Sequence, residues 1–523
     1  MTKPTVWTIA GSDCSAGAGI QADIKTAHGL GVDVRSVITA VTAQNSQGVL
    51  QVNAVSNSAI LAQLQALEAD GQAKVIKIGL LANSQQVELV AAQIQQYKNH
   101  WSPAPQIIYD PVAVSSSGGL LTEDDILPNV IDKLLPLVDV LTPNAMEAQS
   151  ISGHRMTTWR TLEIAAQKIM QLGCKAVIIK GGHLHFNAGK QAQYCVDYGF
   201  DGKQIYCLAS HKISTHHTHG SGCTYASAVA SLLALNYLLR DAMTIAKAYI
   251  NQSISTAVQY QPSNIALWQG AWPNERHYYP TVLVPNSDLA KALHWQPATA
   301  GSKALVNEPS HFANDFPRLS SDSVGFYPVV DSIDWLERLL KMGVSTLQYR
   351  EKKLQGAALS EAISQAVALG KQYQARLFIN DYWQLAIQHQ AYGVHLGQED
   401  ISSADLPQIK NAGLRLGIST HGHYEYLKMM EYRPSYLAIG AIFPTTTKDM
   451  TGQIQGMQTL AKIMALATDI PTVAIGGINL QRAKQVLDTG VSGIAVVTAV
   501  TEAANPQSAV RQFQQLISAR ALS

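Results

Sequence analysis

The stretch HGSGCT at residues 219–224 stands immediately before an apolar run at residues 225–239. Its glycines allow a tight turn in which backbone N–H groups converge, and the apolar run predicts a helix that is buried on all sides. Ser227, Ser231 and Asn236 interrupt the run, which is also too short to cross a bilayer comfortably. A glycine turn that opens a fully buried helix is typical of an α/β domain.

Strand-like apolar runs alternate with helical patterns on the N-terminal side of this turn. Residues 193–198 and 204–208 predict a β-hairpin with Asp201-Gly202 at its turn. The remaining predicted strands, separated by helical patterns such as 58–69 and 84–97, are 6–10, 34–39, 74–78, 106–109, 138–141 and 175–179. Over residues 1–265 we therefore expect a mostly parallel sheet with helices on both faces.

The alternation of strands and helices breaks down between residues 266 and 322. Proline, serine, asparagine and tryptophan are frequent there, and only residues 287–294 show a short amphipathic pattern. We expect this segment to be a partly ordered linker between two domains.

Residues 323–523 contain eight further strand-like runs, most of them followed by a helical pattern. They are 326–330, 346–350, 376–380, 393–396, 415–419, 436–440, 472–476 and 493–498. Eight strand–helix repeats in a segment of this length predict a compact (β/α)8 barrel. Polar and glycine-rich residues cluster just after the strands, at the face where such barrels form active sites.

Length and composition exclude several classes of protein. A chain of 523 residues is too long for one compact core, so two domains are expected. A net charge of +1 predicts no attraction of the whole chain to nucleic acid or to an anionic membrane. Five cysteines without metal-type spacing, and an N-terminus without a secretory pattern, favour a reducing, cytoplasmic compartment. Whether identical chains form a homo-oligomer stays open.

The turn at residues 219–224 has the chemistry of a phosphoryl-binding site. Backbone N–H groups at Gly220, Ser221 and Gly222 would meet the helix N-terminus, whose partial positive charge favours an anion. The same field favours the thiolate of Cys223, which could accept a proton from a substrate hydroxyl. The alternative is a tight turn beside a buried structural cysteine.

Polar residues at other predicted strand ends support phosphoryl transfer. Asp110 ends one buried strand, and Asn144 with Glu147 ends the next. Acidic groups at adjacent strand ends suit Mg²⁺ beside the phosphates of ATP. Lys180 ends another strand and offers a cation to the same phosphates. An ordinary turn explains each of them equally well alone, but their combination in one domain favours a common site.

Seven motifs occur in order between residue 1 and about residue 265: AGSDCSAGAGIQADIKT, TAVTAQNSQGV, KIGLL, DPVAVSSSGGLL, LTPNAMEAQ, KGGH and HGSGCT. Together they resemble the hydroxymethylpyrimidine/phosphomethylpyrimidine kinase family. The resemblance implies a ribokinase-like αβα sandwich that phosphorylates 4-amino-5-hydroxymethyl-2-methylpyrimidine twice, with ATP as co-substrate and Mg²⁺. It implies Cys223 as the base and Gly220, Ser221 and Gly222 as the anion hole. It also implies pyrimidine contacts from Gly11, Asp23 and Gln44, and a carboxamide at 44 pairs a donor and an acceptor with an aminopyrimidine edge.

Some positions depart from the pattern of that family. Ala16, Leu80 and Ser221 stand where Gly, Met and Thr are common, which leaves activity expected but puts the pocket size in question. The nearby histidines are irregularly spaced, so we expect solvated loop residues rather than a metal site. These histidines are His211, His216, His217 and His219.

Cations and carboxylates follow successive strands of the predicted barrel. Alternation along the strand puts Gln348, Arg350 and Lys352 on one side, which suits a polyanion such as pyrophosphate. A salt-bridged strand end is the alternative. Asp381 and Asp400 follow the next two strands, and their carboxylates would suit a Mg²⁺ that also binds pyrophosphate.

A second series of motifs runs from residue 323 to about residue 510: QYREK, INDYW, VHLGQED, GIST, FPTTTK, AIGGI and GIAVVTA. The series resembles thiamine phosphate synthase, which implies a TIM barrel with Mg²⁺ on Asp381 and Asp400. The implied pyrophosphate contacts are Gln348, Arg350, Lys352, Asn380, Ser419 and Lys448. The implied thiazole phosphate contacts are Thr445, Thr447, Gly477, Val497 and Thr498, the last standing where serine is common.

The two resemblances imply a fusion that catalyses consecutive steps of thiamine biosynthesis, because the product of the kinase is the substrate of the synthase. The expected partners are small molecules, without nucleic acid or membrane. One alternative is a pyridoxine or pyridoxal kinase in the N-terminal domain, which Gln44 and Cys223 oppose. The other is a catalytically silent fusion that only binds these ligands, which the intact Lys180, Arg350 and Asp381 oppose.

Overall fold

The structure is a computed structural model that divides into two compact units. The first comprises Met1–Pro285 with Leu289–Ala298, and the second comprises Asn286–Asp288 with Thr299–Ser523. The structure describes residues 3–45, 48–112, 121–184, 193–215, 218–260, 266–297, 315–321, 323–445, 454–466 and 468–521. Across these residues, no helix combines the length and the apolar character needed to cross a bilayer.

A ten-stranded sheet forms the centre of the first unit, in the order β10-β9-β8-β7-β6-β5-β4-β1-β2-β3. The strands are β1 (Thr5–Asp13), β2 (Asp33–Gln44), β3 (Val49–Ala54), β4 (Val75–Ile78), β5 (Gln106–Tyr109), β6 (Val140–Leu141), β7 (Val177–Ile179), β8 (Tyr194–Phe200), β9 (Ile205–His211) and β10 (Thr281–Val282). The run from β2 to β7 is parallel, whereas β3, β8, β9 and β10 pair antiparallel. Strands β8 and β9 form the predicted hairpin, with Gly202 at a φ of 83° in its turn.

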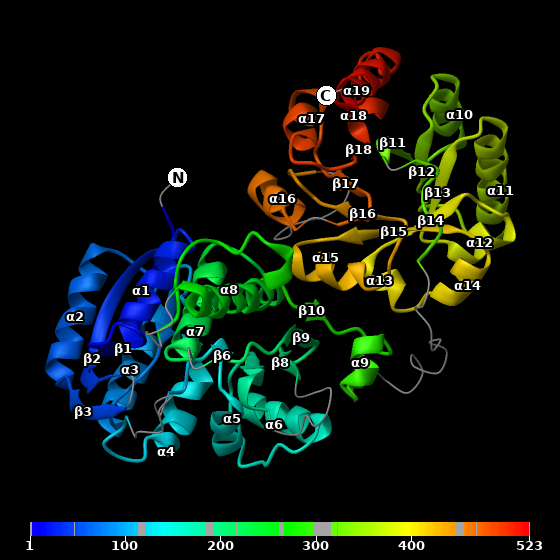
Figure 1. Ribbon diagram of the computed structural model, residues 1–523. Coiled ribbons are helices and arrows are strands. Elements are labelled where there is room, and N and C mark those ends of the chain that lie inside the picture. The colour runs from blue at the N-terminus through cyan, green and yellow to red at the C-terminus, as the bar shows by residue number, and fades with distance from the viewer. Residues whose placement is uncertain are drawn as a thin grey trace. The chain divides into compact units, whose positions relative to one another are not determined.

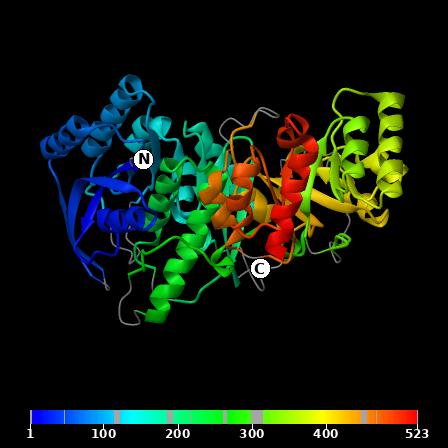
Figure 2. The same ribbon diagram turned by 90° about the horizontal axis from the view of Figure 1, so that it is seen from above.

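Helices cover both faces of this sheet (Figures 1 and 2). They are α1 (Gly19–Gly29), α2 (Asn57–Asp70), α3 (Ser84–His100), α4 (Leu127–Asn129), η1 (Val130–Leu134), η2 (Leu135–Leu137), α5 (Ala145–Ser152), α6 (Trp159–Gln171), η3 (Gly181–His183), α7 (Ser221–Ala234), α8 (Leu239–Tyr260), η5 (Arg276–Tyr278) and α9 (Asp288–Ala292). Successive side chains of β1 point to opposite faces of the sheet. Trp7 and Ile9 join the core under α2 and α3 on one face, whereas Thr8 donates a hydrogen bond to Asp23 of α1 on the other. The αβα sandwich is confirmed, and α7 is buried from Thr224 to Ala234.

The first part of the segment expected as a linker belongs to the sheet and core of the first unit. Strand β10 pairs with β9, and Trp159 Nε1 donates a hydrogen bond to Leu293 O at 2.8 Å. Leu293 and Trp295 are buried in the core of this unit, so the apolar side chains explain why these residues order there. Residues 298–314 and 322 lie outside the described residues.

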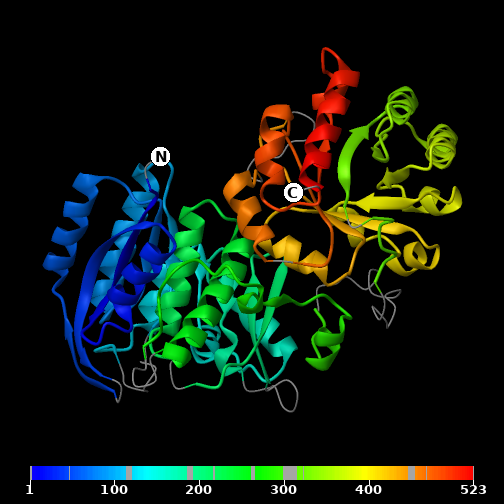
Figure 3. The same cartoon turned by 45° about the horizontal axis from the view of Figure 1, so that its top comes forward.

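Eight parallel strands close the barrel of the second unit (Figure 3). They are β11 (Gly325–Val330), β12 (Thr346–Tyr349), β13 (Arg376–Asn380), β14 (Gly393–Leu396), β15 (Arg415–Thr420), β16 (Tyr436–Ile439), β17 (Thr472–Ile475) and β18 (Gly493–Val496). The helices are α10 (Ile333–Lys341), α11 (Gly356–Gln372), α12 (Trp383–Gln388), α13 (Gln398–Ile401), α14 (Leu406–Asn411), α15 (His423–Met430), α16 (Gly456–Met464), α17 (Leu480–Leu487), α18 (Thr498–Thr501) and α19 (Pro506–Ala521). The predicted barrel and all eight of its predicted strands are confirmed.

Aromatic side chains fill the interior of the barrel. Tyr327, Phe378 and Tyr436 pack there in one buried cluster. Gly417 makes room for the Tyr436 ring, because a Cβ at residue 417 would lie 2.1 Å from that ring. The interior is therefore a packed core, and substrate groups are left to the ends of the strands.

Candidate active sites

Asp110 and Lys180 form an ion pair where β5 and β7 end. Lys180 Nζ lies 2.6 Å from Oδ1 of Asp110, whose side chain is fully buried. Among the described residues, Oδ2 of Asp110 has no hydrogen-bond partner. A buried carboxylate oxygen without a donor is costly unless a ligand uses it, so this oxygen fits a divalent cation.

The N-terminus of α7 lies against this pair at Gly222 and against the loop after β1 at Gly220. A Cβ at Gly222 would lie 3.3 Å from both Asp110 Oδ2 and Lys180 Nζ. Gly220, the N-cap of α7, has a φ of 78°, and a Cβ there would lie 1.8 Å from the carbonyl oxygen of Gly17. The structure thus brings together the predicted anion hole, the lysine and the carboxylate.

Asn144 and Glu147 form a capping box at the start of α5. The Asn144 side chain accepts hydrogen bonds from the amides of Met146 and Glu147 at 2.8 and 3.0 Å. Glu147 Oε2 accepts one from the Asn144 amide at 2.6 Å. Burial raises the pKa of Glu147 to about 7, although Lys180 opposes the shift. Both predicted residues are therefore held beside the Asp110–Lys180 pair, and Asn144 also forms a β-bridge with Lys180.

The expectation that Cys223 is a thiolate is wrong for this structure. Burial raises the pKa of the Cys223 thiol to about 11, and the charges of Asp23 and Asp110 act in the same direction. Lys77 and a backbone hydrogen bond with Gly19 act against the shift but do not overcome it. Desolvation outweighs the field of the helix N-terminus, so the group is a thiol here.

Two of the residues expected to contact the pyrimidine are Gly11, in the second half of β1, and Asp23, in α1. A Cβ at Gly11 would lie 2.9 Å from Leu80 Cδ2. Asp23 is 1% exposed and already accepts several hydrogen bonds. Its donors are Thr8 Oγ1 at 2.5 Å, Lys77 Nζ at 2.9 and 3.0 Å, and Ser227 Oγ at 2.6 Å. A contact between Asp23 and the pyrimidine stays a prediction.

Asp13 and His219 make a contact that the sequence reasoning missed. His219 Nε2 lies 2.8 Å from Asp13 Oδ2, and the His219 side chain is only 13% exposed. The expectation of a solvated histidine is therefore wrong for His219. Gly17 allows the contact, because a Cβ there would lie 2.4 Å from His219 Cδ2. His216 and His217 lie outside the described residues, and His211 is exposed.

The second unit brings two carboxylates and a lysine together after β13 and β14. Asp381, at a φ of 62°, pairs with the ammonium of Lys352. Asp400 Oδ2 accepts a hydrogen bond from the Gly397 amide at 3.1 Å. Burial and the neighbouring carboxylate of Asp381 raise the pKa of Asp400. Two carboxylates in contact fit a divalent cation that would neutralise both.

A chain of hydrogen bonds crosses the interior of the barrel from Gln348 to Ser419. Gln348 Nε2 donates to the Tyr327 hydroxyl at 3.2 Å, and that hydroxyl lies 2.7 Å from the hydroxyl of Tyr436. His395 Nδ1 lies 2.7 Å from the Tyr436 hydroxyl, and His395 Nε2 lies 2.8 Å from Ser419 Oγ. Burial lowers the pKa of His395 to about 4, so the ring is neutral at pH 7. Sequence reasoning missed Tyr327, His395 and Tyr436, because residues inside strands look like core.

Two further predicted pyrophosphate contacts, Arg350 and Asn380, lie at the ends of neighbouring strands. Asn380, the last residue of β13, is buried. Arg350 follows β12, and among the described residues no carboxylate forms an ion pair with its guanidinium. Lys448 lies outside the described residues.

The loops after β16 and β17 meet at Gly477, which has a φ of 61°. A Cβ at Gly477 would lie 2.5 Å from the carbonyl oxygen of Pro444, next to Thr445. Arg482 Nη1 donates to Gly477 O at 2.7 Å, and its guanidinium lies 4.5 Å from the centre of the Phe443 ring. Thr445 and Gly477 are thus close in space. Val497 and Thr498 begin the turn into α18 after β18, and Thr447 lies outside the described residues.

Family models match both units of the chain. The model for phosphomethylpyrimidine kinase matches residues 13–268, and the model for thiamine monophosphate synthase matches residues 326–500. The chain is also 30% identical over 533 residues to the "probable thiamine biosynthetic bifunctional enzyme, chloroplastic" of Oryza sativa subsp. japonica, covering 99% of this chain and 89% of that protein. The chain belongs to the family of bifunctional thiamine biosynthetic enzymes.

As a thiamine biosynthetic bifunctional enzyme, the chain combines a kinase and a synthase, both of them transferases. Its second unit is 55% identical over 194 residues to the thiamine-phosphate synthase of Serratia proteamaculans (strain 568), covering 37% of this chain and 92% of that protein. Its first unit is similar to the crystal structure of phosphomethylpyrimidine kinase from Clostridium difficile 630, with 34% identity and a TM-score of 0.42. That similarity covers 48% of this chain and all of the other.

Proposed function

We propose that the first unit transfers the γ-phosphoryl group of ATP to 4-amino-5-hydroxymethyl-2-methylpyrimidine and then to its monophosphate. We propose that the second unit joins the pyrimidine pyrophosphate formed in this way to thiazole phosphate. This reaction forms thiamine phosphate and releases inorganic pyrophosphate. For the kinase, the observation that carries the proposal is the position of Asp110 and Lys180 against Gly222, at the N-terminus of a buried helix.

In the kinase reaction, the substrate hydroxyl oxygen attacks the γ-phosphorus of ATP and ADP leaves. Lys180 and the amides around Gly220, Ser221 and Gly222 would stabilise the charge on the transferring group. Cys223 would accept the proton of the hydroxyl. It can do so only as the thiolate, so the thiol must first lose its own proton, a step that burial opposes and the charge of Lys77 favours.

Asp110, Asn144 and Glu147 would hold Mg²⁺ with the phosphates of ATP. The unpartnered Oδ2 of Asp110 supports this assignment, and Mg²⁺ usually takes one or two carboxylates together with substrate phosphates. When bound, the ion would neutralise charge on the phosphates. Gly11, Asp23 and Gln44 would hold the pyrimidine.

In the synthase reaction, the bond between the pyrimidine methylene carbon and the pyrophosphate oxygen breaks, and the thiazole nitrogen bonds to that carbon. Gln348, Arg350, Lys352, Asn380, Ser419 and Lys448 would hold the leaving pyrophosphate. Asp381 and Asp400 would hold the Mg²⁺ that neutralises it. Thr445, Thr447, Gly477, Val497 and Thr498 would hold the thiazole phosphate. Charge placed around the leaving group in advance would supply most of the rate gain.

We propose a cytoplasmic location, because all five cysteines are unpaired. We propose that residues 1–265 and 323–523 carry the two activities, and that β10 and the buried Leu293 complete the fold of the first domain.

Incubation of the purified chain with hydroxymethylpyrimidine, thiazole phosphate, ATP and Mg²⁺ tests both activities, with thiamine phosphate measured by chromatography. We expect product from the wild type and none from Cys223→Ala, with recovery when the pyrimidine pyrophosphate is supplied. Arg350→Ala should form thiamine phosphate about 10²–10³ times more slowly under either condition.

Two outcomes would overturn parts of the proposal. If the wild type makes no product even from supplied pyrimidine pyrophosphate, the synthase assignment fails. If it phosphorylates pyridoxal faster than hydroxymethylpyrimidine, the substrate assigned to the first unit is wrong.

A further inference from the structure

The carboxylate of Asp13 collects hydrogen bonds from three separate segments of the first unit. Asp13 ends β1 and is 2% exposed. Three donors come from the loop that follows it: the amides of Ser15, Gly17 and Ala18, at 2.8, 3.1 and 2.8 Å. The Ser15 hydroxyl adds bonds of 2.8 and 2.9 Å. The remaining two donors are the Gln44 side chain and His219 Nε2.

Two of these donors are not local to the turn. An Asp side chain in a turn ordinarily bonds backbone groups close to it in the chain, whereas Gln44 and His219 are far away in the sequence. The pKa of Asp13 reflects this, because burial acts to raise it but hydrogen bonds from His219, Gln44 and Ser15 lower it well below its ordinary value. The carboxylate is therefore ionised, and its hydrogen bonds join three segments of the chain.

The loop between Asp13 and α1 is pressed directly against the anion hole. His219 immediately precedes Gly220, whose Cβ position lies 1.8 Å from the carbonyl oxygen of Gly17. Within the loop, Ala16 adopts a φ of 59°, which is unfavourable for a residue with a Cβ. The loop therefore takes its shape from these contacts rather than from local preference.

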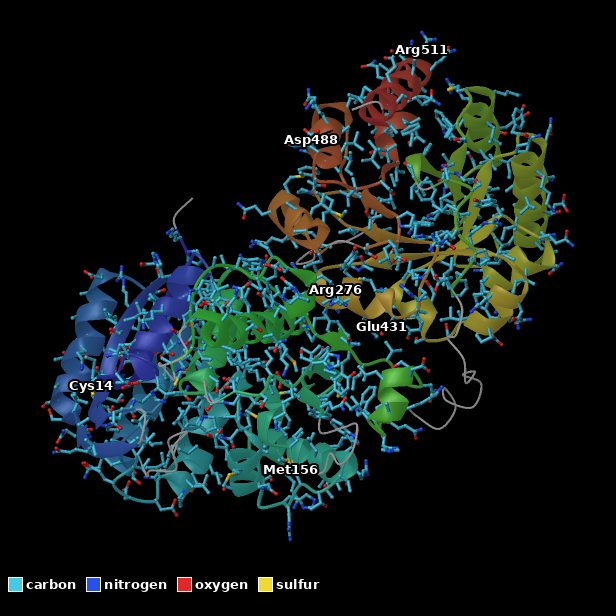
Figure 4. The ribbon with its side chains drawn as sticks, in the orientation of Figure 1. Cys14, Met156, Arg276, Glu431, Asp488 and Arg511 are labelled. Carbon is cyan, nitrogen blue, oxygen red and sulfur yellow. The ribbon has the colours of Figure 1, made fainter. Side chains whose placement is uncertain are left out.

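The same loop is attached to the strand that carries Gln44. Cys14, labelled in Figure 4, donates from Sγ to Gln44 O at 3.3 Å and accepts from the Gln44 amide at 3.4 Å. Gln44 is thereby bonded to the loop through its backbone and to Asp13 through its side chain.

We propose that Asp13 and His219 are positioning residues that align the pyrimidine end of the kinase site, at Gln44, with its phosphoryl-transfer end, at Gly220–Cys223. The inference rests on the proposed kinase function. A shift of either loop would change the distance between the bound alcohol and the transferring phosphoryl group. Rates of such transfers depend steeply on that distance.

The test compares His219→Leu, which removes the N–H donor, with His219→Gln, which keeps one, in the full-length chain. Initial rates of phosphorylation give kcat and the KM for hydroxymethylpyrimidine. We expect His219→Leu to lower kcat/KM about 100-fold, through both a lower kcat and a higher KM. The higher KM is the diagnostic result, because His219 is proposed to affect pyrimidine binding only through its hydrogen bond to Asp13, which in turn holds Gln44. His219→Gln should recover most of the loss.

Asp13→Asn provides the second half of the test. It replaces one carboxylate oxygen by an NH2 group that faces N–H donors, and it should lower kcat/KM like His219→Leu. The double variant should be no worse than the poorer single variant, because both changes break one connection. If Asp13→Asn does not fold, the two His219 variants decide the question alone.

Three results would overturn the inference or its basis. A purely structural role would lower the melting temperature of His219→Leu and its amount of active enzyme while leaving the KM unchanged. Equal losses in His219→Gln and His219→Leu would also overturn the inference. If the wild type does not phosphorylate the pyrimidine, the proposed function itself fails, which the wild-type reaction reveals separately.

Discussion

Lys180 Nζ lies 2.6 Å from Oδ1 of Asp110, and the Asp110 side chain is fully buried while that of Lys180 is 16% exposed. A buried ion pair of this kind contributes little net stability, but removal of one partner leaves an uncompensated charge. Burial acts to lower the pKa of Lys180, and Asp110 with Glu147 more than offsets this and raises it. The ammonium of Lys180 is therefore charged at neutral pH.

Lys180→Met should cost about 3 kcal/mol of stability in the first unit, because it strands the buried Asp110 carboxylate. The double variant Lys180→Met with Asp110→Asn should regain most of that stability and yet have no kinase activity. Calorimetry of the full chain measures the first quantity, and phosphate transfer from ATP measures the second. Synthase turnover of supplied pyrimidine pyrophosphate should stay at the wild-type rate in both variants. A double variant with kinase activity would contradict the proposed role of this pair.

Gly222→Ala should reduce kinase activity about 100-fold without unfolding the protein. The added Cβ would lie 3.3 Å from both Asp110 Oδ2 and Lys180 Nζ, in the space proposed for the transferring group. Gly48→Ala is the matched control, since a Cβ there meets no atom of the described residues within 4 Å. Kinase rates and melting temperatures of the two variants are compared. An active Gly222→Ala enzyme would show that phosphate does not approach residue 222.

Arg350→Ala should lower the kcat of the synthase by about 10²–10³ with little change in stability. No carboxylate pairs with this guanidinium among the described residues, so its loss breaks no ion pair there. Arg350→Lys should recover only part of the rate, because an ammonium lacks the forked geometry that matches phosphate oxygens. Steady-state rates with supplied substrates measure the effect. A large loss of melting temperature in Arg350→Ala would instead indicate a structural role.

The barrel should lose stability between about pH 6.5 and pH 4 because of His395. Burial lowers its folded-state pKa from 6.5 to about 4. As the pH falls through 6.5, the unfolded chain therefore takes up a proton that the folded barrel does not. The stabilisation is complete above pH 6.5 and falls by up to about 3 kcal/mol by pH 4.

Hydrogen exchange of peptides from β14 and β16 at several pH values measures this loss. His395→Gln should show a flatter dependence on pH, since it removes one of two buried imidazoles of the barrel, the other being His423, whose pKa burial lowers to about 3. The same slope in both proteins would assign the effect to other residues.

Cys223 should react with iodoacetamide far more slowly than the exposed Cys14. With a pKa of about 11, the thiolate fraction of Cys223 at pH 8 is about 10⁻³, against about a quarter for an unperturbed thiol. Mass spectrometry of tryptic peptides after timed alkylation gives both rates. Fast labelling of Cys223 would mean that its thiol is more acidic and more open to solvent than the structure shows.

Much of the fold follows from local patterns in the sequence. All eight barrel strands occur where apolar runs predict them, because each strand is buried on both sides and so reads as a short apolar block. Strand β3 was not predicted, since its residues are mostly exposed and give no clear pattern. Strand β10 was placed in the linker, because two residues of edge strand carry too little periodicity to detect.

The proposed site residues were found where chemistry and position coincide. Asp110, Lys180 and Asp381 are charged residues that directly follow predicted strands, and parallel strands place such ends on one edge. Tyr327 and His395 were missed, since nothing local distinguishes a buried polar network from core.

The sequence by itself determined the order of the two units, the class of each fold and the residue types at the strand ends. These depend on apolar periodicity and on short motifs, which act over a few residues. Only the tertiary structure decided that His219 bonds Asp13 and that Cys223 is a thiol. It also decided that the charge of Asp381 contributes to the raised pKa of Asp400. The physical reason is that hydrogen bonds and desolvation depend on which distant segments pack together, and that information lies in the fold as a whole.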